Sequence, residues 1–254
     1  MAGFTRKKIK VDGVDVVALT AGKGEPLVFF HGAGTFHGFD FALPWAEKFQ
    51  VMIPFHPGFG ESGDDERITD MHDYVMHYME LFDQLKLDRV NLVGLSMGGW
   101  IASRLATEFG SRIKRLALVA PAGLRDLKNP MTDIFKLKPE EIVTKLAYNF
   151  DVLKPHLPTG HDVDFIVARY RESSSFARVA WDRSFDPKLS RYLHRLTMPT
   201  LIVWGDKDAL IPPGQAKTWA KMIPNAKVKV IANAGHLVLD EKAEAVQAIG
   251  KFFE

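Results

Sequence analysis

Short aliphatic and β-branched runs recur along the chain, and longer amphipathic stretches separate them. This alternation is typical of a mostly parallel β-sheet with helices on both faces. Asp12 and Gly13 join the first two runs, and this two-residue hairpin signal predicts that the sheet begins with an antiparallel pair. The predicted strands are residues 7–11, 14–19, 27–31, 50–55, 90–95, 115–120, 200–204 and 227–231.

Three stretches carry the apolar spacing of amphipathic helices. The clearest is residues 70–85, where apolar side chains recur at steps of three or four and form one face. A second helix opens near Gly98. A third is predicted to begin at Asp240, a residue type that commonly caps helix N-termini.

The alternation of predicted strands and helices stops between residues 124 and 198. This segment contains five prolines, two predicted helices at residues 139–149 and 162–177, and no convincing strand. A structureless loop of that length is improbable within a compact domain, so we expect a helical cap inserted between two strands. The predicted organisation is a core domain of residues 1–123 and 199–254, with a cap of residues 124–198.

Composition and charge exclude several classes of function. The net charge is +2, from 33 Lys and Arg against 31 Asp and Glu, which provides no electrostatic footprint for nucleic acid or an anionic membrane. The absence of cysteine excludes disulfides, thiolate zinc sites and a cysteine nucleophile. No apolar run approaches the roughly 18 residues of a membrane span, and no secretory signal follows the first ten residues. We expect a soluble, cytoplasmic monomer or homodimer.

The strongest chemical signal is the hexapeptide Gly94-Leu95-Ser96-Met97-Gly98-Gly99, between a predicted strand and a predicted helix. A tight strand-to-helix turn needs small neighbours around its apex, and the two flanking glycines supply them. Ser96 Oγ would then project above the sheet, beside the free N–H groups of the helix start. The alternative is a Gly-flanked turn with an idle serine.

A serine nucleophile needs a base, and His236 is the best placed of the nine histidines. It follows the last predicted strand and precedes the last helix, so a loop would hold it at the carboxyl edge of the sheet. Several other histidines lie in polar or helical surroundings and are interpreted as surface residues or satisfied partners, and no H-E-x-x-H metal signature occurs. These are His37, His72, His77, His156, His161 and His194.

The acid that orients this histidine should also leave a strand end. Asp206 and Asp208 both follow the run at residues 200–204. Asp208 is favoured because three residues of turn carry it toward the loop of His236, whereas Asp206 lies in the tight turn itself. The alternative for both carboxylates is local turn chemistry.

With the order Ser96, Asp208, His236, the chain resembles the serine members of the α/β-hydrolase family over nearly its full length. The segments His31-Gly32-Ala33-Gly34 and Pro57-Gly58-Phe59-Gly60-Glu61-Ser62 match loops of that family. The resemblance implies an α/β-hydrolase fold, with an eight-stranded, mostly parallel sheet and an inserted helical lid. It also implies that the backbone N–H groups of Ala33 and Met97 form the oxyanion hole.

Residues 58–63 also fit the G-x-G-x-x-G pattern of dinucleotide-binding sites, but the context does not. That fingerprint opens directly into a helix, whereas three acidic residues, Asp64, Asp65 and Glu66, follow here and would repel a pyrophosphate. Asp83, at the spacing of the ribose-binding acid, lies within the predicted helix at residues 70–85. We therefore interpret the glycines as a shaped loop.

The predicted function is a cofactor-independent serine hydrolase that cleaves a small or medium ester or a related carbonyl compound. Large apolar residues near residue 39 and in the cap could line a cleft for a small-molecule substrate with a hydrophobic portion. They are Phe36, Phe39, Phe41, Met131, Phe135, Phe150, Phe165 and Trp181.

The sequence leaves alternatives to this function open. The elbow and lid also resemble hydrolases that cleave carbon–carbon bonds of vinylogous diketones, although Leu95 stands where those enzymes often carry Asn. Ser96 argues against epoxide hydrolases and haloalkane dehalogenases, which use Asp at that position. A ligand receptor that retains a slow hydrolase pocket, and a perhydrolase side activity, are further alternatives.

Overall fold

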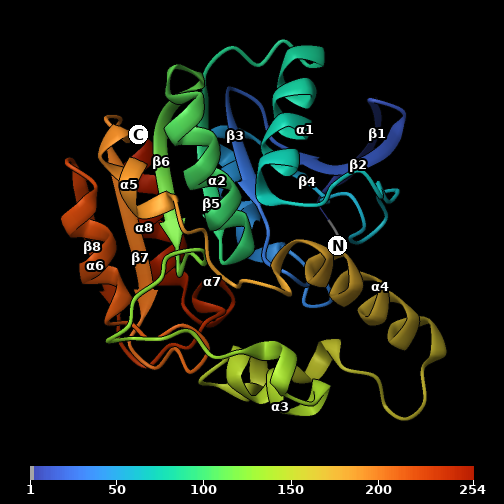
Figure 1. The fold of residues 1–254 in the computed structure, drawn as a ribbon. Helices are drawn as coiled ribbons and strands as arrows, with labels where there is room; N and C mark the ends of the chain where they lie inside the picture. The colour runs from blue at the N-terminus through green and yellow to red at the C-terminus, as the bar shows by residue number, and fades with distance from the viewer. Residues whose placement is uncertain (1–2) are drawn as a thin grey trace.

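The computed structural model describes residues 3–254 and contains one eight-stranded sheet (Figure 1). The strand order is β1-β2-β4-β3-β5-β6-β7-β8; β2 pairs antiparallel with β1 and β4, and all other pairs are parallel. Val11 lies opposite Val14 across the predicted hairpin. The α/β-hydrolase architecture is therefore confirmed. The strands are β1 (Thr5–Val11), β2 (Val14–Ala21), β3 (Glu25–Phe30), β4 (Phe49–Pro54), β5 (Val90–Leu95), β6 (Ile113–Val119), β7 (Thr200–Gly205) and β8 (Ala226–Ile231).

Two hydrophobic cores cover the two faces of this sheet. Successive strand residues point to opposite faces, so Val28 and Phe30 enter one core while Leu27 and Phe29 enter the other. The first core also receives the helices α1 (Met71–Gln84), α2 (Met97–Glu108) and α6 (Gln215–Met222). The second receives the 3₁₀ helix η1 (Asp40–Glu47) and the helices α7 (Val238–Glu241) and α8 (Ala243–Phe253).

The predicted helix at residues 70–85 is confirmed, whereas the predicted start of the last helix is wrong. Asp70 caps α1 by accepting hydrogen bonds from the N–H groups of His72 and Asp73. Asp240 lies within α7 instead of capping α8, and its carboxylate pairs with His37 Nδ1 at 3.0 Å. The ion pair with His37, which is distant in sequence, therefore sets the role of Asp240.

Between β6 and β7 the chain forms helices, turns and irregular structure, with one isolated β-bridge between Gly123 and Phe185. The two longest helices are α3 (Pro139–Leu146) and α4 (Val163–Ala180). We call these two and the chain between them, residues 139–180, the cap helices; they lie beyond the carboxyl ends of the parallel strands (Figure 1). The other elements of this segment are η3 (Ile134–Lys136), η4 (Phe150–Val152), η5 (Lys154–His156), α5 (Leu189–Tyr192) and η6 (Leu193–Arg195), and η2 (Gly110–Arg112) lies between α2 and β6.

The end of the inserted segment belongs to the packing of the sheet. Leu189, Leu193 and Leu196 have no exposed surface and lie in the same core as α1 and α2. The inserted segment therefore has two parts. The cap helices lie beyond the carboxyl edge of the sheet, and the chain that returns to β7 packs against the sheet. None of the helices within residues 3–254 is long and apolar enough to cross a membrane.

Candidate active site

Ser96 occupies the turn between β5 and α2 in a backbone conformation that L-residues rarely adopt. Its φ is 53° and its ψ is −115°. A residue held in such a region costs of order 1–3 kcal/mol and persists only where the surroundings fix it. Here the Ser96 N–H donates to the Val119 carbonyl at 3.0 Å, and the Ser96 carbonyl accepts from the N–H groups of Trp100 and Ala122. The side chain remains partly exposed.

The two glycines that flank Ser96 are required because backbone approaches them closely. A Cβ at Gly98 would lie 2.1 Å from the Phe30 carbonyl oxygen and 2.5 Å from that of His31. A Cβ at Gly94 would lie 2.4 Å from the Gly98 carbonyl oxygen. The first turn of α2 therefore packs directly against the end of β3 and against the end of β5.

His236 and Asp208 form a buried pair on two neighbouring loops. His236 Nδ1 lies 2.8 Å from Asp208 Oδ2, so its N–H can donate to that oxygen. The other carboxylate oxygen, Asp208 Oδ1, accepts from the N–H groups of Leu210 and Ile211 at 2.9 and 2.8 Å. Three hydrogen bonds thus fix the carboxylate, which in turn sets the orientation of the imidazole and places the proton on Nδ1.

Asp206, the other candidate acid, has different surroundings. It lies 3.4 Å from Lys207 Nζ and makes no hydrogen bond to His236. Its backbone N–H donates to the Ile231 carbonyl, which joins the end of β7 to β8. The structure therefore brings His236 together with Asp208 and leaves Asp206 in the turn; the assignment of the catalytic acid stays a prediction.

The loop of His236 is tied to the cap helices. The Leu237 N–H donates to the Leu146 carbonyl at 2.8 Å. Glu241 bridges the two segments, because its carboxylate accepts from the Gly235 N–H at 2.7 Å and from the Asn149 N–H at 2.8 Å. The position of the histidine loop thus depends on the end of α3 as well as on the sheet.

The two amides predicted to form the oxyanion hole are unoccupied donors. Among the hydrogen bonds of residues 3–254, none uses the backbone N–H of Ala33 or of Met97. Met97 is the first residue of α2, where backbone N–H groups lack intrahelical partners. In the same part of the chain, no hydrogen bond joins Ser96 to His236; such catalytic bonds often tighten only when substrate binds.

A histidine pair beneath the oxyanion loop was not identified from the sequence. His31 Nδ1 donates to the Gly32 carbonyl at 2.6 Å, and His31 Nε2 accepts from the His56 N–H at 3.0 Å. His56 Nε2 donates to the His31 carbonyl at 2.9 Å, and its Nδ1 is hydrogen-bonded to the Tyr78 hydroxyl. Every ring nitrogen of the neutral pair therefore has a partner.

Burial keeps these two imidazoles neutral. Both side chains are fully buried, and this burial lowers the pKa of His56 to about 3 and lowers the pKa of His31 well below its ordinary value. The pair links the end of β3 to the loop after β4 without adding charge next to the candidate oxyanion hole. The signal in the sequence was a histidine close to the end of each of two buried strands, since His31 directly follows β3 and His56 lies two residues after β4.

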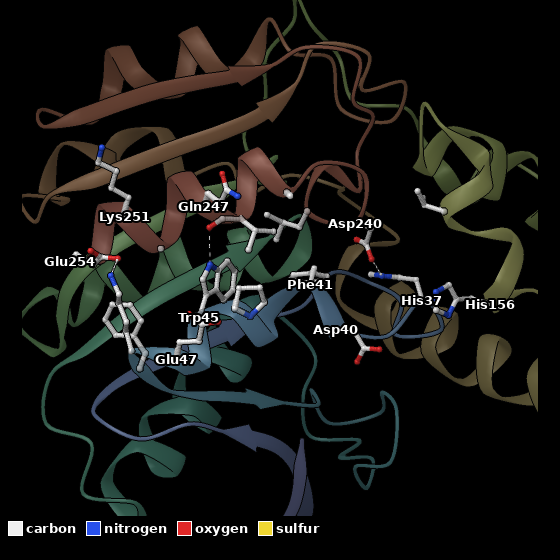
Figure 2. A pocket seen from close by; sticks show the side chains of 18 residues that line it. His37, Asp40, Phe41, Trp45, Glu47, His156, Asp240, Gln247, Lys251 and Glu254 are labelled. Atoms are coloured by element: carbon white, nitrogen blue, oxygen red, sulfur yellow. Dashed lines mark hydrogen bonds and ion pairs between the residues drawn. The ribbon is translucent and has the colours of Figure 1, made fainter. Parts of the chain in front are cut away.

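A cavity lies away from these residues. Its volume is about 700 Å³, and it runs between η1 and α8 from Lys48 and Glu254 to His37 and His156 (Figure 2). None of the five predicted site residues lines it. The His37–Asp240 pair lies at one end (Figure 2).

The aromatic residues proposed to line a cleft have separate roles. Phe41 lines the cavity of Figure 2, whereas Phe39 has no exposed surface and packs edge-on against Phe29, so its proposed place in a substrate cleft is wrong. Phe36 packs against Phe165 of α4. Trp181 is 67% exposed and therefore does not line an enclosed pocket.

A metal centre has no support in the arrangement of side chains. Over residues 3–254, no group of three or more His, Asp or Glu residues is placed to hold a metal ion. What the described site can do is supply a hydroxyl on a strained turn, two free backbone donors and a buried His–Asp pair.

The chain is similar to known hydrolases in both sequence and structure. The model of the alpha/beta hydrolase family matches residues 27–249. Lipase 1 from Psychrobacter immobilis is 28% identical over 256 residues, covering 91% of this chain and 78% of the lipase. A 2-hydroxy-6-oxo-6-phenylhexa-2,4-dienoate hydrolase from Burkholderia cepacia is also 28% identical, over 89% of this chain and 86% of its own.

A solved structure shows the same fold. The crystal structure of a bacterial membrane phospholipase A superimposes with a TM-score of 0.84, covering 99% of this chain and 86% of its own, at 21% identity. This likeness extends over the cap helices as well as the sheet.

The neutral histidine pair generates a prediction about acid stability. The folded pKa of His56, about 3, lies below the unfolded value of about 6.5, so between these values the unfolded chain binds one more proton. The free energy of unfolding should therefore fall as pH drops from 6 to 4, by up to about 1.4 kcal/mol per pH unit for this histidine. Urea unfolding of wild type and His56→Gln at several pH values measures the slope, which the substitution should reduce.

His194→Gln is the matched control, because His194 is exposed. It should leave the pH slope unchanged. Equal slopes for wild type and His56→Gln would contradict a buried neutral imidazole at position 56.

Proposed function

We propose that this chain, which belongs to the alpha/beta hydrolase family, is a serine hydrolase that cleaves small or medium esters through an acyl-enzyme on Ser96. The observation that carries the proposal is the buried Asp208–His236 pair at the same sheet edge as the strained turn of Ser96. Two loops distant in sequence from Ser96 supply the base and the acid that a serine nucleophile needs.

The first half of the proposed reaction forms the acyl-enzyme. His236 Nε2 takes the proton of Ser96 Oγ as that oxygen attacks the ester carbonyl, and Asp208 stabilises the imidazolium through its bond to Nδ1. The N–H groups of Ala33 and Met97 donate to the developing oxyanion. His236 then returns the proton to the alkoxide, which leaves as the alcohol.

The second half restores the enzyme. Water replaces the alcohol, gives a proton to His236 and attacks the acyl carbonyl, and the same two amides bind the second oxyanion. Collapse of this intermediate releases the carboxylic acid and returns the proton to Ser96 Oγ. All of these groups come from the chain itself, so the proposed chemistry needs no cofactor.

A carbon–carbon bond hydrolase is the second candidate, favoured by the similarity to the dienoate hydrolase from Burkholderia cepacia. Leu95 and the sequence His31-Gly32-Ala33-Gly34 depart from the pattern of such enzymes and favour the ester. The proposed substrate is a small molecule with a hydrophobic portion. We also propose that the protein is cytoplasmic, is a monomer or homodimer, and has neither nucleic acid nor a membrane as a partner.

The roles of the three site residues can be tested by substitution. Ser96→Ala should abolish fluorophosphonate labelling and reduce kcat/KM for p-nitrophenyl butyrate by about 10³-fold or more, because no nucleophile remains. Asp208→Asn should cost about 10³- to 10⁴-fold, since an amide cannot hold the same histidine tautomer. Asp206→Asn is the matched control and should stay within a few-fold of wild type. The reverse ranking of the two aspartates would show that the acid is Asp206.

The substrate class is tested by direct competition. Purified protein is offered p-nitrophenyl esters, lactones, thioesters and a 2-hydroxy-6-oxo-dienoate, and kcat/KM is measured for each. Steady multiple turnover with the highest kcat/KM on an ester is expected. Preference for the dienoate would select the carbon–carbon hydrolase, and a single slow burst with a ligand-dependent Tm would indicate a receptor.

A further inference from the structure

Glu172 is a buried carboxylate that the proposed mechanism does not use. It lies on α4, one of the cap helices, and only 2% of its surface is exposed. Its partners come from two loops of the core as well as from α4 itself. Acidic side chains are rarely buried this completely unless several donors satisfy their oxygens.

Four donors surround the two oxygens of Glu172. Thr35 provides two of them, with its N–H 3.2 Å from Oε2 and its hydroxyl 2.5 Å from Oε1. The Gly60 N–H donates to Oε1 at 3.1 Å. Arg169 Nη1 lies 2.5 Å from Oε2 and balances the charge. Within this cluster both carboxylate oxygens are fully engaged.

The contacts to Thr35 matter because of where Thr35 lies. It is two residues after Ala33, whose N–H is one of the two proposed oxyanion donors, in a loop that follows β3 and belongs to no strand or helix. The direction of the Ala33 N–H therefore depends on what holds this loop. His31 fixes the loop where it begins, and Glu172 fixes it after Ala33.

A second contact joins the same loop to the same helix. Phe36 packs edge-on against Phe165, with ring centroids 6.0 Å apart, and the Arg169 guanidinium lies 5.2 Å from the centre of the Phe36 ring. Thr35 and Phe36 thus both contact α4, and Phe36 also packs against the second hydrophobic core of the sheet. The loop that carries one proposed oxyanion donor is therefore held in part by the cap helices.

Stability alone does not account for this arrangement. A buried ion pair often contributes little net stability, because the cost of removing both charges from water offsets their attraction. What the carboxylate does contribute is direction, since two bonds to one residue fix both its backbone and its side chain. A displacement of about 1 Å in a catalytic group can reduce rate by about 10²-fold.

We propose that Glu172 is a positioning residue that holds the oxyanion loop, through Thr35, in the geometry needed for the transition state. The inference rests on the proposed function for its effect on rate, while the holding of the loop is independent of that function. It assigns the cap helices a role in catalysis besides any role in substrate selection.

The experiment compares four variants with wild type. Glu172→Gln keeps the size of the side chain but turns one oxygen into a donor, which then faces the donors of Thr35 or Gly60. Thr35→Val removes only the hydroxyl and leaves the Glu172–Arg169 pair in place, so it keeps the test valid if Glu172→Gln fails to fold. The double variant of these two completes the cycle.

Arg178→Gln is the matched control. Arg178 also lies on α4 and also joins the cap to the core, but it contacts Asp64 and the Asp65 carbonyl, away from the oxyanion loop. Loss of this contact should lower Tm without changing kcat by more than about twofold.

For Glu172→Gln and Thr35→Val, kcat on p-nitrophenyl butyrate should fall by about 10- to 100-fold with KM within about threefold, because the interaction acts in the transition state. The rate of fluorophosphonate labelling should fall in parallel. In the double variant the losses should not multiply, because both act through the same contact. An unchanged kcat, fully multiplicative losses, or an equal loss in Arg178→Gln would overturn the inference.

Amide hydrogen exchange separates this inference from the proposed function. Peptides covering residues 31–38 should exchange faster in Glu172→Gln than in wild type and Arg178→Gln. If the wild-type protein neither turns over esters nor labels at Ser96, the proposed function fails, and faster exchange in Glu172→Gln alone still supports the holding of the loop. Unchanged exchange in that variant would overturn it.

Discussion

The site depends on one contact between two segments of main chain. The first turn of α2 lies so close to the end of β3 that no side chain fits between them, since a Cβ at Gly98 would lie 2.1 Å from the Phe30 carbonyl oxygen. This contact brings the turn that carries Ser96 and Met97 against the strand that leads into Ala33. The placement of Ser96 and of the two amides follows from this contact, whereas a larger residue at Gly98 would separate the two segments.

Much of this arrangement could be predicted because its signals are local. Buried strands have short apolar runs with clear ends, and the glycines around Ser96 predict the turn directly. Asp208 was separated from Asp206 by the length of the turn alone, and the structure pairs His236 with Asp208. The strand order could not be derived in the same way, and the family resemblance implied only an eight-stranded, mostly parallel sheet.

Residues whose roles depend on distant partners could not be predicted. Thr35 and Glu172 are 137 positions apart, and neither has a periodicity or motif that points to the other. Asp240 carries a sound N-cap signal, yet His37, which is 203 positions away, pairs with it. The burial of Phe39 could not be predicted for the same reason. An aromatic side chain near a site can pack in the core or line a cleft, and only its neighbours in the structure distinguish the two.

The turn at Ser96 also has a consequence for the evolution and engineering of this chain. Glycine adopts a φ near 53° freely, whereas serine there costs of order 1–3 kcal/mol out of the roughly 5–15 kcal/mol that stabilise a typical domain. Selection for thermal robustness alone would therefore favour glycine at this position. Under the proposed function, durability and reactivity therefore make opposite demands on residue 96.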